Sequence, residues 1–144
     1  MTEFWNKQPE AWKQCHIDCV SPEEAMSQIA MFYGTWSQIY KLIWVAMPVC
    51  FDWMFLKGYY SAFAPDGSPD IGFKATCGST LRDYAIKSKI ITNKEFDAIV
   101  KVIPTGLDHK AIDDATCQGI IFVELIKLIN ANVANSKKLQ KKNK

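Results

Sequence analysis

Residues 21–63 are the most apolar and most aromatic stretch of the chain, and they constrain its fold more than any other segment. An aromatic residue recurs there at every fourth position, which places the rings along one side of an α-helix; these are Phe32, Trp36, Tyr40 and Trp44. Other apolar segments can leave water only by packing against such a surface. The stretch therefore predicts that helices pack on helices.

Signals for helix starts and ends divide the rest of the chain. Ser21-Pro22-Glu23-Glu24 and Thr92-Asn93-Lys94-Glu95 are typical of helix N-termini, and Pro48 bends or breaks the first helix. We expect helices over about residues 21–47, 48–63, 79–89, 93–102 and 111–131, and a further short helix could cover residues 9–15. No strand is expected. The predicted fold class is all-α, a compact bundle of about five helices.

Two further expectations concern packing. In the turn-rich loop 64–77, Ile71 and Phe73 should fold back onto the helices. The last helix should face inward with one apolar stripe; its members are Ile112, Ala115, Gly119, Phe122, Ile126 and Ile129.

The size and charge of the chain limit the classes of protein to which it can belong. With 144 residues, 49% hydrophobic and 22% charged, it is expected to form a single globular domain over residues 1–135. Five of the 17 basic residues lie in residues 137–144, which leaves 12 basic against 15 acidic residues elsewhere. We interpret residues 136–144 as a basic, disordered tail. An acidic body of this kind argues against nucleic acid as a partner.

Cysteine use and hydropathy suggest a compartment. The five Cys residues are scattered, and no signal peptide is recognisable after Met1. The apolar run 42–51 is shorter than the about 20 residues that a bilayer requires. We therefore expect a cytoplasmic protein with reduced thiols and no contact with a membrane.

Metal and cofactor sites are not expected. Cys15, His16 and Cys19 could form half of a zinc site, but a closed site needs four ligands and the other Cys residues are isolated. Two ordinary thiols are the favoured interpretation. Glycines are scattered rather than gathered in a phosphate loop, and no Cys lies in a catalytic signature with His16 or His109.

The segment from Thr80 to Ile129 resembles the second half of the HEPN superfamily, in particular its degenerate, mannitol-operon-repressor-like branch. Three short runs carry the resemblance: Leu81-Arg82-Asp83-Tyr84-Ala85, Ser88-Lys89-Ile90-Ile91-Thr92, and the helix opening Ile112-Asp113-Asp114-Ala115 followed by Phe122-Val123-Glu124-Leu125-Ile126. The likeness extends over the C-terminal two thirds of the chain. It implies a helical bundle in which His109 takes the place of the family's histidine.

The chain departs from that family at the residue that matters for catalysis. HEPN ribonucleases use an arginine to neutralise the phosphate, but Pro104 occupies that place here and Thr105 replaces its polar neighbour. Arg82 is the single arginine of the chain. Lys101 is the nearest cation before His109, and lysine lacks the planar fork with which arginine grips a phosphate. The resemblance therefore implies that the fold is kept without the nuclease.

Three hypotheses follow. We favour a non-catalytic protein-interaction or regulatory module, such as an inhibitor, an immunity-type protein or a regulator, that binds a larger protein through an aromatic-rich face and can form a homodimer. The expected binding residues are Trp36, Tyr40, Trp44, Tyr60 and Phe73. The alternatives are a residual ribonuclease that uses His109 and Lys101, and a small-molecule or nucleotide binder that stacks its ligand on Trp36 or Trp44.

Overall fold

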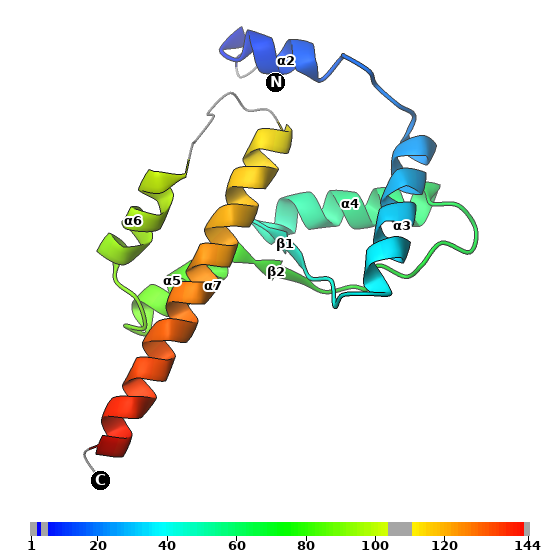
Figure 1. Ribbon diagram of the computed structural model, residues 1–144. Helices are drawn as coiled ribbons and strands as arrows, with labels where there is room; N and C mark the ends of the chain where they lie inside the picture. Colours follow the sequence, from blue (N-terminus) through cyan, green and yellow to red (C-terminus); the bar gives the residue numbers. More distant parts are fainter. Residues whose placement is uncertain (1–2, 4–5, 104–110, 143–144) are drawn as a thin grey trace. The chain divides into compact units, whose positions relative to one another are not determined.

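The computed structural model describes residue 3, residues 6–103 and residues 111–142, and it is mostly helical (Figure 1). The chain divides into two compact units, residues 1–77 and residues 78–144, which we call unit 1 and unit 2. Each unit has a hydrophobic core of its own. The predicted helical class is confirmed in its coarse form, whereas the five-helix bundle and the single domain over residues 1–135 stay predictions.

Unit 1 contains a β-α-β arrangement. Its described elements are α2 (Pro9–Gln14), α3 (Pro22–Ser37), β1 (Trp44–Ala46), α4 (Val49–Phe63) and β2 (Ala75–Cys77). The two strands pair in parallel, with Trp44 opposite Ala75 and Ala46 opposite Cys77. A parallel pair needs a crossover connection, and α4 supplies it (Figure 1).

The small sheet corrects the expectation of a chain without strands. The helix that was expected over residues 21–47 ends at Ser37, because β1 follows before Pro48. Each strand has three residues, which is too short for an alternating pattern to be recognised in the sequence. The apolar run before Pro48 was compatible with either a buried helix or a buried strand, and the pairing with β2 selected the strand.

The core of unit 1 lies between α3, α4 and the loop before β2. Its buried members are Met26, Ala30, Tyr60 and Ile71. The Tyr60 hydroxyl donates a hydrogen bond to the Pro69 carbonyl oxygen at 2.8 Å, which ties the loop to α4. Ile71 is buried as expected, but Phe73 is 79% exposed, so the expectation that it folds inward was wrong. In an extended chain the two residues would share a side, but Gly72 between them adopts φ +76° and turns the chain, so the two side chains need not point the same way.

The loop before β2 is also held by a carboxylate. Asp70 accepts a hydrogen bond from the backbone N–H of Gly72 at 2.8 Å and one from Lys57 Nζ at 3.4 Å. Both interactions favour the ionised form and lower the pKa of Asp70, the backbone hydrogen bond being the larger cause. Gly72 adopts φ +76°, a conformation that side chains rarely tolerate.

Unit 2 is built from α5 (Gly78–Lys87), α6 (Asn93–Val102) and the long α7 (Ala111–Lys142). The predicted capping box of α6 is confirmed, because the Thr92 side chain accepts from the Glu95 backbone N–H and the Glu95 carboxylate accepts from the Thr92 backbone N–H. Ala85, Ile91 and Leu125 are buried together in its core. Asn132 of α7 donates to the Ile90 carbonyl oxygen at 2.9 Å, which closes one end of that core.

The inward face of α7 differs from the expected one. Leu125, Leu128 and Ile129 pack into the core of unit 2, whereas Ile112 is 72% exposed and Gly119 is exposed. Apolar residues occur on two opposite sides of this helix, so periodicity alone could not select the buried side. The helix also continues to Lys142, into the segment that was expected to be a disordered tail.

Residues Ala111–Lys138 of α7 form a helix that is long and apolar enough to cross a membrane, judged by length and composition. This helix differs from the run 42–51, which is too short for the same role. Core helices of water-soluble proteins satisfy the same criterion, so the packing around α7 has to decide what the apolar surface does.

Candidate functional site

The clearest candidate site is a row of exposed rings along α3 and the turn that follows it. We call Phe32, Trp36 and Tyr40 the aromatic row. The centroids of Phe32 and Trp36 are 6.4 Å apart, and Trp36 and Tyr40 stack at 5.9 Å with an interplanar angle of 26°. The three side chains are between 41% and 59% exposed. Aromatic rings that pack on one another and still face solvent form a pre-ordered apolar surface.

The sequence explains why this surface is available. The Ser21 hydroxyl caps α3 by accepting from the Glu24 backbone N–H at 3.2 Å, which fixes where the helix begins. One side of α3 then faces the core through Met26 and Ala30, and the row lies on its flank. Residues 25–40 contain no Asp, Glu, Lys or Arg, so charge does not interrupt the exposed flank.

Trp44, the fourth ring of the predicted series, belongs to the core instead. It stacks on Tyr33 at 5.7 Å with an interplanar angle of 9°, and it meets Trp53 at 5.5 Å. Its indole N–H donates to the Ile71 carbonyl oxygen at 3.1 Å. Trp44 therefore has a structural role, because its ring already packs against Tyr33 and Trp53.

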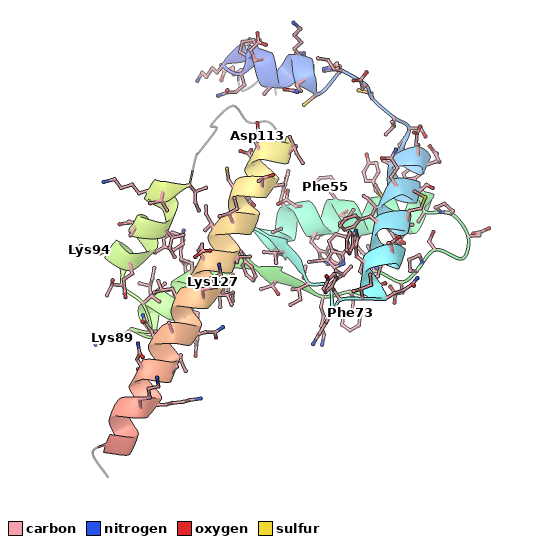
Figure 2. The ribbon with its side chains drawn as sticks, in the orientation of Figure 1. Phe55, Phe73, Lys89, Lys94, Asp113 and Lys127 are labelled. Atoms are coloured by element: carbon pink, nitrogen blue, oxygen red, sulfur yellow. The ribbon has the colours of Figure 1, made fainter. Side chains whose placement is uncertain are left out.

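Tyr60 and Phe73, two more of the expected binding residues, lie in contrasting environments. Tyr60 is buried, and burial is the main cause that raises the pKa of its hydroxyl. Phe73 projects from the loop before β2, where Figure 2 labels it, and the Nζ of Lys74 lies 5.6 Å from its ring centroid. The structure therefore brings Trp36 and Tyr40 together and places Tyr60 in the core.

A second row of rings, which the sequence analysis did not single out, lies on α4. We call Phe51, Phe55 and Tyr59 the α4 row; all three are exposed, and Phe51 and Phe55 meet edge to face at 5.1 Å (Figure 2 labels Phe55). The signal was present, because these residues recur at every fourth position. It was missed because α4 is apolar on nearly every side, so no one face stood out.

Polar groups of unit 2 surround a groove of about 360 Å³ between α5 and α6. The Arg82 guanidinium lies 5.5 Å from the Phe96 ring centroid, and its Nε and Nη2 donate to Asp83 Oδ1 at 2.8 and 2.6 Å. Lys87 and Asp97 also line the groove. The two cations are balanced by two carboxylates, so the groove has no marked preference for an anionic ligand.

The residues expected for a residual ribonuclease cannot be compared as a pair. Lys101 is exposed on α6. Pro104, Thr105 and His109 lie outside the described residues.

At the possible zinc half-site, local contacts account for the polar groups. The Cys19 thiol donates to the Cys15 carbonyl oxygen at 3.1 Å, and His16 Nδ1 lies 2.7 Å from the Trp12 carbonyl oxygen. The His16 ring also packs edge to face on Trp12 at 4.4 Å. In the part of the chain that the structure describes, His, Cys, Asp and Glu side chains form no group of three or more that could hold a metal ion.

No family model, curated protein or solved structure matches this chain. The resemblance to the HEPN superfamily therefore stays a prediction from the sequence, and function has to be argued from the surfaces described above.

Proposed function

We propose that this protein is a non-catalytic interaction module that binds a larger protein through the aromatic row of α3. The observation that carries the proposal is the stacked and exposed set Phe32, Trp36 and Tyr40. Aromatic side chains of this kind are the usual anchors of protein interfaces, since they bury a large area with little loss of conformational freedom.

The surroundings of the row support an interface. Ile39 is exposed beside it, and the nearest charged residues along the chain are Glu24 and Lys41. The centre of a protein interface is depleted of charge and enriched in aromatic residues and Met, with charges at its rim. The composition of residues 25–40 fits that description better than it fits a solvated helix face.

The core of unit 1 does not need these rings. Met26, Ala30, Tyr60 and Ile71 form it, and Trp44 and Trp53 pack around them. Exposed rings of this size are unfavourable in water, and burial of one of them against a partner is worth about 1.5–3 kcal/mol. A partner that offers an apolar groove would recover this free energy, and the α4 row supplies further apolar surface on the same unit.

The experiment compares two single substitutions in the full chain. A photo-crosslinking amino acid replaces Ile39, next to the row, and the crosslinked protein is identified in the native cell. The same experiment is repeated with Trp36→Ser and, as the control, with Phe73→Ser, which removes a more exposed ring from a different part of unit 1. We expect one partner whose crosslink is lost with Trp36→Ser and kept with Phe73→Ser.

Binding of the purified partner then gives the magnitude. Trp36→Ala should raise the Kd by about 30-fold or more, as expected for an interface anchor. Equal binding by wild type and Trp36→Ala, with both proteins folded by circular dichroism, would remove the aromatic row as the binding surface.

A further inference from the structure

Helix α7 has a second side, uncharged and half apolar, which unit 2 does not cover. Its inner side packs on α5 and α6 through Leu125, Leu128 and Ile129. On the opposite side six residues follow one another at alternating intervals of four and three positions, and we call them the outer stripe: Ile112, Thr116, Gly119, Val123, Ile126 and Asn130. This alternation keeps the side chains on one side of a helix, as in the seam of a coiled coil.

The outer stripe has the properties of a seam that is not yet closed. Ile112 is 72% exposed and Val123 is 50% exposed. The Thr116 hydroxyl donates to the Ile112 carbonyl oxygen at 2.7 Å, so this polar group would be satisfied when buried. A Cβ at Gly119 would meet nothing within 4 Å, which leaves room for another helix to approach there.

A bilayer is a poor occupant for this surface. Leu125, near the middle of α7, packs against Ala85 of α5 and Ile91 beyond it. The two short helices around that contact carry many charged side chains, including Asp83, Lys87, Lys94 and Asp97. If α7 crossed a membrane with this packing intact, those charges would enter the hydrocarbon at a cost of about 2.5–3.5 kcal/mol each. This packing therefore favours a water-soluble occupant over a bilayer.

The charges along α7 identify a helix that fits. Asp113 and Asp114 lie in its first turn, Lys137 and Lys138 lie near its other end, and Glu124 and Lys127 pair with each other at 2.6 Å in between (Figure 2 labels Asp113 and Lys127). A second copy of α7 that runs antiparallel brings the aspartates of each copy to the lysines of the other. A parallel copy would place like charges together at both ends.

We propose that two copies of this protein associate through the outer stripes of α7 in antiparallel orientation. When the two-fold axis passes between Val123 and Ile126, Val123 of one copy meets Ile126 of the other, and Gly119 meets Asn130. The pairing is isologous, so the assembly closes as a dimer. Asn130 opposite Gly119 fixes the register, as a single polar residue does in a coiled-coil seam.

This dimer involves unit 2 alone and does not rest on the proposed function of unit 1. The test begins with sedimentation velocity of the full chain over a series of concentrations. We expect the wild type to dimerise. Val123→Lys should raise the dimer dissociation constant by about 100-fold or more, since it buries an unpaired charge in the seam. The matched control is Ala131→Lys, which adds the same charge to the same helix outside the stripe.

Charge reversal tests the orientation. Asp113→Lys with Asp114→Lys should weaken the dimer by about tenfold, as should Lys137→Glu with Lys138→Glu, and the four substitutions together should restore it. In a parallel dimer each substituted pair would face the same pair of the other copy, so like charges would still meet and neither double substitution alone would weaken association.

Several results would overturn the proposal. They are a wild type that stays monomeric at all concentrations, a dimer that Val123→Lys leaves intact, a dimer that Trp36→Ser dissociates instead, and a dimer that neither charge-reversed pair weakens. Sedimentation of the wild type with phosphatidylcholine vesicles, abolished by Val123→Lys, would assign the stripe to a membrane.

Discussion

Trp36 and Trp44 are the same residue type in one sequence pattern, yet their environments assign them different roles. Trp44 stacks between Tyr33 and Trp53 and donates a hydrogen bond to the Ile71 carbonyl oxygen, whereas Trp36 stacks on its neighbours in the row and faces solvent. Trp44→Phe should lower the free energy of unfolding by about 1–3 kcal/mol, because it removes ring area and the hydrogen bond of a half-buried carbonyl.

The matched variant is Trp36→Phe, which makes the same chemical change on the surface. It should change the free energy of unfolding by less than about 0.5 kcal/mol. Urea unfolding followed by circular dichroism measures both. A larger loss of stability in Trp36→Phe than in Trp44→Phe would contradict the assignment of the two rings.

Single residues of the candidate site were predictable only where the chain stays helical. Spacing by four identified Phe32, Trp36 and Tyr40 as one row, and their rings do pack in sequence. Helical hydrogen bonding continues past Ser37 to Tyr40, whose backbone N–H donates to the Trp36 carbonyl oxygen at 2.8 Å. The same rule failed at Trp44, because the chain has left the helix and entered a strand there. Exposure is not encoded in spacing, so Tyr60 and Phe73 could not be separated before the packing was known.

At the scale of elements, local signals were reliable and pairing was not. The capping residues Ser21 and Thr92 mark the starts of α3 and α6, because a cap is decided by hydrogen bonds within four residues. The pairing of β1 with β2 joins residues about 30 positions apart, and no local pattern reports it. The buried side of α7 likewise depends on α5 and α6, so the sequence offered two apolar sides of equal merit.

The capping box of α6 should make the stability of unit 2 depend on pH. Hydrogen bonds from Thr92, mainly from its side chain, lower the pKa of Glu95 in the folded protein. The unfolded chain then binds more protons in the interval between the folded and the ordinary pKa. The contribution of Glu95 is therefore fully present above its ordinary pKa, and it is lost as pH falls through the folded-state value.

Glu95→Gln should remove this part of the acid dependence, because the amide keeps an acceptor oxygen but has no charge to titrate. Urea midpoints of the wild type and the variant, measured by circular dichroism from about pH 6 to about pH 3, should converge as the pH falls. Asp97→Asn, which removes another carboxylate from the same helix, serves as the control. Curves for Glu95→Gln and wild type that stay parallel over this interval would show that the capping carboxylate is not the cause.

At the scale of the whole molecule, each unit has its own core and its own spectroscopic signature. Ile71 is buried in the core of unit 1 and Leu125 in the core of unit 2. All five Trp residues precede residue 78, so tryptophan fluorescence reports on unit 1 alone, whereas helical circular dichroism reports on both units. The two probes can therefore separate the stability of one unit from that of the other.

Truncation of either core residue should act on its own unit. Ile71→Ala should lower the stability of unit 1 by about 2–5 kcal/mol and shift the fluorescence transition in urea, because it leaves a cavity where an aliphatic side chain was fully buried. Leu125→Ala should lower the stability of unit 2 by a similar amount and shift the circular dichroism transition while the fluorescence transition stays in place. If both variants shift both transitions equally, the units unfold as one cooperative body, and the division at residue 78 has no thermodynamic counterpart.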